Sequence, residues 1–393
     1  MSIHAAAYRE PVKGLRNTYS TDTKKLYMLT LMRQMTASHH KKNDGRPAQE
    51  RTAEARNPAR SEIVRYVIQA TGFAVALAVA AFPSLTTART AHSGGTLNIV
   101  TYSTPGPVYS GPLAAAFAKT KAGKHVSLSV SPGPSDSQSQ AVANGQPADV
   151  VNFSYAPNIQ TLVGKHLVPK SWDRNPYHGN VTDSVVAFGV RQRNPKHIKN
   201  WSDLLKKGIQ VLTPNPQASG GAKWNLLAAY GAQRETRRSK KQAVGYLKKL
   251  FKHVSVQDTS ASHELNTFLN GTGDVMIGYE DDIMEAQQKM PGKIKLVVPK
   301  QSLLIENPIS WTLKPAAHNA RLAKKFVSFL YSKRAQTIWA KAFYWPVVKS
   351  VARHHHFPRP KKLFNIRQLG GWPKLDPEFF GPNGIVTKIE QGG

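Results

Sequence analysis

Short β-branched runs alternate with amphipathic segments from about residue 95 to the C-terminus. A run such as 97–102 is apolar enough for a buried strand, and a segment such as 241–252 repeats apolar residues at the spacing of one helix face. We therefore expect an α/β protein with mostly parallel sheets. The expected strands cover 97–102, 126–130, 149–153, 185–191, 209–213, 254–257, 275–279, 294–298 and 309–313. The expected helices cover 111–120, 157–165, 201–206, 220–230, 241–252, 281–289, 316–331 and 334–343.

Three of the strand-to-helix corners are rich in serine and glycine. The first has Ser135 as the helix N-cap, with Gln138 completing a capping box, and its helix stops at Asn144. The second has Ser219 as the N-cap, followed by two glycines, and the third covers 258–263. Each corner offers unpaired N–H donors and the positive end of a helix dipole. Several such corners together can hold an oxyanion without lysine or arginine, whereas a single one indicates only a well-capped helix.

The first 91 residues differ from the rest. Residues 1–60 are polar, basic and without periodicity, which indicates disorder or a start codon placed too early. Residues 61–91 have a basic flank, an apolar run at 72–82 and small residues at the exit, which is the pattern of a secretory signal peptide. That run is well short of the roughly 20 residues that span a bilayer, so we expect cleavage and export to the periplasm instead of a transmembrane anchor.

The excess of positive charge indicates an anionic partner. The 393 residues include 54 Lys and Arg against 23 Asp and Glu, a net charge of +31, and no cysteine. Nucleic acid, anionic membrane and small anions are the candidates, and export argues against nucleic acid. The absence of cysteine excludes disulfides and thiolate metal sites. No Gly-x-Ser-x-Gly motif or triad indicates an enzyme, and the histidines at 354–356 do not form a shaped metal site, so we expect no cofactor.

Four segments carry a resemblance to a known family. They are 144–151, 213–225, 273–280 and 370–372. Through them, and above all through TPNPQASGGAKWN at 213–225, the chain resembles periplasmic sulfate-binding proteins over residues 96–389. The resemblance implies a two-lobed periplasmic-binding-protein fold of type II, with an anion in the interlobe cleft. We expect lobe 1 to cover 95–186 and 306–393, and lobe 2 to cover 187–305. It also implies a monomer that delivers sulfate or thiosulfate to the permease of an ABC importer.

The resemblance assigns an anion site made of neutral donors. The matching positions are Ser135, Ser219, Gly220, Gly221, Ala261 and Tyr279. Ser135 supplies its hydroxyl and its N–H, and Ala261 supplies a backbone N–H. Tyr279 stands where the sulfate binders have a tryptophan that donates its indole N–H, and a phenol can donate as well.

Other positions near these corners depart from the family or have an open role. Ser103 replaces an aspartate that orders nearby loops, and Asp136 replaces a glycine. Asp136 either faces solvent on the first helical turn, which is the favoured interpretation, or faces the anion. We expect Lys223 to pair with a carboxylate on the helix surface, and Ser262 is a further candidate beside the third corner.

The corners favour a fully deprotonated anion. Sulfate carries no proton at neutral pH, so a buried acceptor facing it would stay unpaired, at a cost of roughly 1–3 kcal/mol. The corners at Ser219 and Ala261 have no carboxylate at the contact positions. The sequence therefore predicts a sulfate or thiosulfate binder. The alternatives are a binder of another tetrahedral oxyanion, such as molybdate or phosphate, and a basic secreted surface-binding protein.

Overall fold

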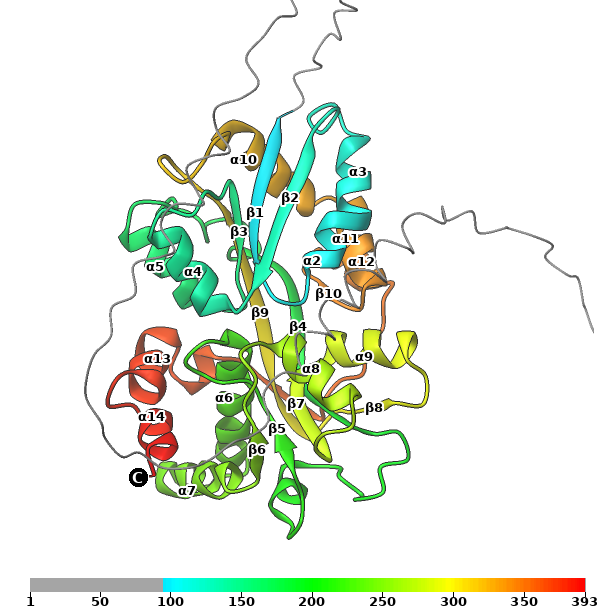
Figure 1. Ribbon diagram of the computed structural model, residues 1–393, viewed down its shortest axis with the longest axis vertical. Helices are drawn as coiled ribbons and strands as arrows, with labels where there is room; N and C mark the ends of the chain where they lie inside the picture. The colour runs from blue at the N-terminus through cyan, green and yellow to red at the C-terminus, as the bar shows by residue number, and fades with distance from the viewer. Residues whose placement is uncertain (1–94, 393) are drawn as a thin grey trace, which may run out of the picture. The chain divides into compact units, whose positions relative to one another are not determined.

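A single mixed sheet runs through the described part of the chain. The computed structural model describes residues 95–392 (Figure 1). The strands are β1 Thr96–Tyr102, β2 Ser127–Gly133, β3 Val150–Asn152, β4 Asn180–Arg191, β5 Val211–Leu212, β6 Val254–Val256, β7 Val275–Tyr279, β8 Ile294–Val297, β9 Gln301–Trp311, β10 Trp345–Pro346 and β11 Lys362–Phe364. Their order in the sheet is β2-β1-β3-β9-β4-β7-β5-β6, with β8 and β10 paired to β4 and β11 paired to β9.

Helices cover both parts of this sheet. They are α2 Gly106–Val108, η1 Tyr109–Leu113, α3 Ala114–Ala118, α4 Ser135–Ala143, α5 Ala156–Gly164, η2 Trp201–Leu205, α6 Gly220–Glu235, α7 Lys240–Phe251, α8 Ala261–Leu269, α9 Glu280–Lys289, α10 Ala320–Leu330, α11 Lys333–Lys341, α12 Lys349–Ala352, η3 Arg367–Leu369, α13 Trp372–Phe380 and α14 Ile385–Glu390. In α10, for example, Ala323, Phe326, Val327 and Leu330 form one buried face. Among the described residues, no helix is long and apolar enough to span a membrane.

The sheet has two parallel halves joined by long strands. In the β1–β3 half, β1 pairs in parallel with β2 and β3. In the β5–β7 half, β5 pairs in parallel with β6 and β7. The antiparallel pairs all involve β4 or β9, which run through both halves (Figure 1). This two-part α/β arrangement agrees with the predicted fold class.

The expected elements lie close to the observed ones, with two differences. Strand β9 begins at Gln301 instead of residue 309, because polar residues such as Ser302 and Asn307 are buried in its first part and mask the apolar pattern. The C-terminal helices were not expected either. Helix α14 contacts α7, and β11 pairs with the start of β9, so these parts of the C-terminal segment lie against the β5–β7 half, whereas α13 also contacts α5 of the other half. The lobe boundaries stay a prediction. The predictions for 1–60 (disorder or an early start codon) and for 61–91 (a signal peptide) lie outside the described residues.

The buried tryptophans and one buried aspartate hold these elements together. Trp201, Trp224, Trp339 and Trp345 are buried. The carboxylate of Asp149, just before β3, accepts the N–H groups of Asn98 in β1 and of His318 and Asn319 before α10, each at 2.8 Å. Asp149 is fully buried. It therefore joins two strands to a helix start.

We expect Asp149→Asn to destabilise the fold. The variant loses the negative charge and one of the two acceptor oxygens, and hydrogen bonds to a charged group contribute about 1.5–3 kcal/mol each. The free energy of unfolding, measured by urea denaturation with the m-value checked, should fall by about 2 kcal/mol or more. The control is Asp173→Asn at an exposed position, which should change it by less than about 0.5 kcal/mol. Equal stability of both variants would remove this role from Asp149.

Candidate functional site

Three helix starts meet at one small cavity. These are the starts of α4, α6 and α8, which follow β2, β5 and β6. The residues that line the cavity are Tyr102, Ser103, Pro134, Ser135, Ser154, Ser219, Gly221, Ala261 and Tyr279. The cavity has a volume of about 10 Å³, against about 790 Å³ for the groove beside Trp172, so only a small solute suits it. The corners that the sequence singled out thus converge, while their role in binding stays a prediction.

Two glycines allow α6 to begin at this place. A Cβ on Gly220 would lie 2.1 Å from Ser154 Oγ and 2.5 Å from the Tyr155 ring, so only glycine lets α6 approach that segment. A Cβ on Gly221 would lie 3.2 Å from the Tyr279 ring, on the cavity side. Gly220, which was predicted to contact the anion, does not line the cavity. It packs instead against the segment that follows β3.

The cavity receives backbone N–H groups from the first turns of the three helices. Ser135, Gly221 and Ala261 lie at the first or second helical position of α4, α6 and α8. N–H groups at these positions have no acceptor within their own helix, and they carry the positive end of the helix dipole. The cavity is therefore electropositive without a lysine or arginine among its lining residues.

Three buried hydroxyls at the cavity lack a partner. Tyr102 Oη, Ser154 Oγ and Tyr279 Oη are buried, and no hydrogen bond satisfies them among residues 95–392. Burial raises the pKa of both phenols well above its usual range, so they stay protonated donors. Their rings stack with centroids 6.0 Å apart. An unpaired buried hydroxyl costs about 1–3 kcal/mol, and a ligand that accepts hydrogen bonds would remove this cost.

Sequence reasoning missed Tyr102 and Ser154. Tyr102 is the last residue of β1, and Ser154 follows the end of β3 at Asn152. In open α/β sheets, ligands lie beyond the carboxyl ends of strands. This rule, applied to every strand end, would have found both residues.

The predicted cap at Ser135 is wrong. Ser135 is the first residue of α4, and Pro134 is the N-cap. The Ser135 hydroxyl donates to Asn158 Oδ1 at 2.7 Å and accepts the N–H of Ser154 at 3.0 Å, because α5 and the end of β3 lie directly beside it. Gln138 bonds the carbonyl of Ser131 instead of completing a capping box. Ser135 therefore offers its backbone N–H to the cavity, while its hydroxyl is engaged elsewhere.

Ser219 is the N-cap of α6, as predicted, but its side chain makes no cap hydrogen bond. The Ser219 side chain lines the cavity, so the hydroxyl is available to a ligand. Ser103 also lines the cavity, and its Oγ accepts the N–H of Ser262 at 3.4 Å. Ser262 itself does not line the cavity, and its hydroxyl lies 3.1 Å from that of Ser260.

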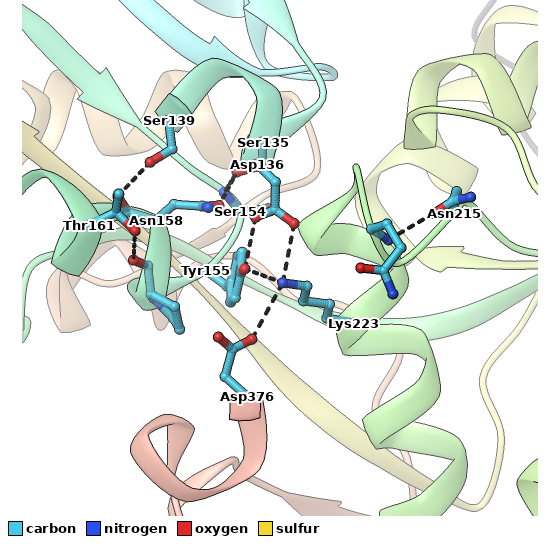
Figure 2. A network of polar contacts seen from close by, with 12 residues as sticks. Ser135, Asp136, Ser139, Ser154, Tyr155, Asn158, Thr161, Asn215, Lys223 and Asp376 are labelled. Atoms are coloured by element: carbon cyan, nitrogen blue, oxygen red, sulfur yellow. Dashed lines mark hydrogen bonds and ion pairs between the residues drawn. The ribbon is translucent and has the colours of Figure 1, made fainter. Parts of the chain in front are cut away.

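Asp136 and Lys223 do not line the cavity. Figure 2 shows them paired with each other next to Tyr155. Asp136 faces neither solvent nor the cavity, so both interpretations of its carboxylate were wrong. It accepts from Tyr155 Oη at 2.7 Å and Asn158 Nδ2 at 2.6 Å, and it pairs with Lys223 Nζ at 3.2 Å. Lys223 is buried instead of on the surface, because the helix that carries Asp376 covers it.

Acidic groups lie behind the cavity rather than in it. No carboxylate lines it, but Asp281 and Asp282 at the start of α9 are buried, and burial raises the pKa of both. Asp281 accepts a short hydrogen bond from Ser184. A raised carboxyl pKa favours the neutral form, which lowers the negative charge near the cavity. Between residues 95 and 392, no group of three or more His, Asp or Glu is placed to hold a metal ion.

Comparison with known proteins agrees with this architecture. A family model described as bacterial extracellular solute-binding protein matches residues 97–344. The sulfate-binding protein of Salmonella typhimurium is 36% identical over 284 residues, which cover 70% of this chain and 86% of that protein. The thiosulfate-binding protein of Escherichia coli is 30% identical over 293 residues, which cover 72% of this chain and 86% of that protein.

Solved structures show the same fold. The sulfate-binding protein SubI from Mycobacterium tuberculosis superimposes with a TM-score of 0.70 at 38% identity, over 73% of this chain and 99% of SubI. The periplasmic binding protein AfuA from Actinobacillus pleuropneumoniae has a TM-score of 0.55 at 20% identity, over 76% of this chain and 98% of AfuA, and is alike in fold alone. The predicted two-lobed fold is confirmed.

We expect the stability of the protein to fall as the pH rises from about 4 to about 8. Burial raises the pKa of Glu280 and of Asp183 to about 8, whereas an unfolded carboxyl titrates near pH 4. Between these values the folded protein holds protons that the unfolded chain has released, so each rise in pH favours unfolding. Urea denaturation at pH 5, 6, 7 and 8 measures the slope.

Glu280→Gln tests the cause of this slope. The amide keeps an acceptor for Trp345 Nε1, which donates to Glu280 at 2.6 Å, and it removes the titration. The variant should equal the parent protein near pH 5 and exceed its stability at pH 8 by at least about 1.4 kcal/mol, the equivalent of one pKa unit. Glu378→Gln, which removes a partly exposed partner of Lys240, is the control and should keep the parent slope. If the stability of Glu280→Gln fell with rising pH as steeply as that of the parent protein, Glu280 would not cause the pH dependence.

Proposed function

The chain belongs to the bacterial extracellular solute-binding protein family, and we propose that it binds sulfate or thiosulfate in the cavity between α4, α6 and α8. One observation carries this proposal. The cavity presents several hydrogen-bond donors, among them two buried phenols without a partner, and no carboxylate. The sulfate-binding and thiosulfate-binding relatives support the same solute class.

The donor set favours a fully deprotonated anion. A protonated phosphate is bound best where a carboxylate accepts its proton, and no carboxylate lines the cavity, where only hydroxyls can accept. Asp136 accepts from Tyr155 and Asn158, Asp281 accepts from Ser184, and neither carboxylate lines the cavity. We therefore expect binding of sulfate and thiosulfate and much weaker binding of phosphate.

Five of the lining residues have an assigned role in this proposal. Ser219 donates its hydroxyl, and Tyr279 donates its phenol in place of an indole. Ser135, Gly221 and Ala261 donate backbone N–H groups. Release of the anion then requires no titration of the site, because the two halves of the sheet can open around β4 and β9.

The family supports a proposal about the location and the partner of the protein. We propose that the protein is exported through residues 61–91, acts as a monomer in the periplasm and presents the closed, anion-bound form to an ABC permease without catalysing a reaction. The lobes would be those predicted, except that the C-terminal segment from β11 onward groups with the β5–β7 half, on which it packs.

Calorimetry of the purified protein tests the function. Sulfate, thiosulfate, molybdate and phosphate are titrated in turn at low and at high salt. A buried anion site should keep most of its affinity when the salt concentration rises, whereas a surface site for polyanions should lose it steeply. Heat from phosphate alone, or from none of the four anions, would overturn the proposal.

Ser219→Ala should weaken anion binding. A hydrogen bond from a hydroxyl to a buried charge contributes about 1.5–3 kcal/mol, so the Kd should rise by about ten- to a hundredfold. The control is Ser328→Ala on the exposed side of α10, where the hydroxyl bonds only the carbonyl of Lys324. Calorimetry with sulfate and with thiosulfate gives both Kd values, and an unchanged Kd in Ser219→Ala would remove Ser219 from the site.

Tyr279→Phe should lower the anion affinity without lowering the stability of the fold. The phenol has no partner within the described chain, so its removal should leave the unfolding free energy unchanged or raise it. Anion affinity should instead fall by about tenfold or more, because a donor to the charge is lost. Calorimetry and urea denaturation of the same preparation measure the two effects. Lower stability with parent affinity would show that Tyr279 is a packing residue only.

A further inference from the structure

The acidic residues of the described chain are unevenly distributed. Every Asp and Glu between residues 95 and 392 lies in 136–306 or 376–390, so 95–135 and 307–375 contain none. These two acid-free stretches supply α3, α10 and α11. We call the exposed cations on these three helices, and on the turn after α3, the basic face. They are Lys119, Lys121, Lys124, Arg321, Lys324, Lys325, Lys333, Arg334 and Lys341.

The three helices that carry the basic face pack together through aromatic rings. Phe117 of α3 packs on Phe326 of α10, with ring centroids 4.9 Å apart. Tyr109 of the preceding η1 packs on Phe326 and on Trp339 of α11, with centroids 6.3 Å and 5.2 Å apart. These four rings are buried. Because the helices turn their rings inward, the cations on their opposite sides point outward and belong to one surface.

No carboxylate within residues 95–392 forms an ion pair with the basic face. The ion pairs of this part of the chain all involve other cations, for example Lys206 with Asp203 at 2.6 Å. Lys324 has an aromatic contact, 5.5 Å from the ring centre of Trp311. Cations gathered on one surface repel one another, and anions from outside the chain relieve this repulsion.

Several of these cations lie where the fold itself disfavours them. Lys333 and Arg334 are the first two residues of α11, and Arg321 is the second residue of α10. Neither helix has an acidic residue in its first turn. The start of a helix carries the positive end of its dipole, so a cation there lowers helix stability, whereas an anion raises it. An anionic partner would be attracted by the cations and by both helix starts.

The other side chains of the surface indicate what kind of anion it binds. Among the described residues, Met290 of α9's C-cap is the exposed large apolar side chain, and it does not belong to the basic face. The basic face therefore has no exposed aromatic ring on which a nucleic-acid base could stack, and no apolar anchor that could enter a bilayer. An array of Lys and Arg without either feature suits the phosphates at the surface of an anionic membrane.

We propose that the basic face binds the headgroups of anionic phospholipids and holds the protein on a membrane surface without insertion. This is a function in addition to solute binding. The cavity stays accessible, because it lies at Tyr102, where β1 ends, whereas α10 begins beside the first half of β1. There, His318 Nδ1 lies 3.1 Å from Asn98 Nδ2. The protein can therefore bind its solute while it stays on the membrane.

Co-sedimentation with vesicles tests the proposal. The full chain should bind vesicles of phosphatidylcholine mixed with phosphatidylglycerol, and it should not bind vesicles of phosphatidylcholine alone. Binding should fall steeply as the salt concentration rises, because exposed charges are screened. Each Lys or Arg near an anionic membrane contributes roughly fivefold to the affinity. Equal binding to both kinds of vesicle would overturn the proposal.

Two triple variants with the same change in net charge locate the surface. The first combines Lys325→Gln, Lys333→Gln and Arg334→Gln on the basic face, and its Kd for the mixed vesicles should rise by about a hundredfold. The control combines three exposed lysines of α7, which packs on α6 and α14, and its Kd should rise by less than about threefold. Its substitutions are Lys248→Gln, Lys249→Gln and Lys252→Gln. Equal Kd values for the two triple variants would overturn the proposal, because net charge alone would then explain the binding.

Further measurements separate a structural effect, another partner and the solute site. Urea denaturation should find the first triple variant at least as stable as the parent protein, because two cations leave the start of α11. Binding of a duplex oligonucleotide at about 0.15 M salt, where the vesicles no longer bind, would assign the basic face to nucleic acid and overturn the proposal. Sulfate calorimetry should give the same Kd with and without vesicles. Vesicle binding without binding of any of the four anions would support this inference and overturn only the proposed function.

Discussion

An anion leaves water only where protein donors replace its hydration, and this constraint explains the arrangement around the cavity. Backbone N–H groups at helix starts are suitable donors because they are unpaired and carry no charge of their own. They can converge only if the corners after β2, β5 and β6 lie together. That convergence depends on α6 reaching Ser154, which Gly220 alone permits. The close packing at Gly220 therefore supports the whole site.

The acidic start of α9 shows how the same constraint acts on neighbouring groups. Glu280, Asp281 and Asp282 lie at the positive end of the α9 dipole, yet burial raises their pKa values enough to favour protons. Neutral carboxyls beside Tyr279 repel an anion less than carboxylates would. Burial of these carboxyls makes the stability of the fold depend on pH, and it keeps the cavity electropositive.

The local sequence pattern predicted the strands, the helices and the strand-to-helix corners. It did not predict contacts between side chains that lie far apart in the chain. Serine and glycine after a strand placed Ser219, Gly221 and Ala261 correctly at the cavity. The hydroxyl of Ser135 donates to Asn158, which lies 23 residues later in the chain, so the sequence around Ser135 does not predict that contact. The first part of β9 was missed because its buried polar side chains are satisfied by other strands, as Ser302 is by Val186.

Consecutive residues at the start of α4 make different kinds of contact. Successive helical positions point about 100° apart, so the first turn can direct the Ser135 N–H to the cavity and the Asp136 carboxylate to Lys223. Asp136 therefore connects the start of α4 to Lys223 in α6 without adding an acceptor to the cavity.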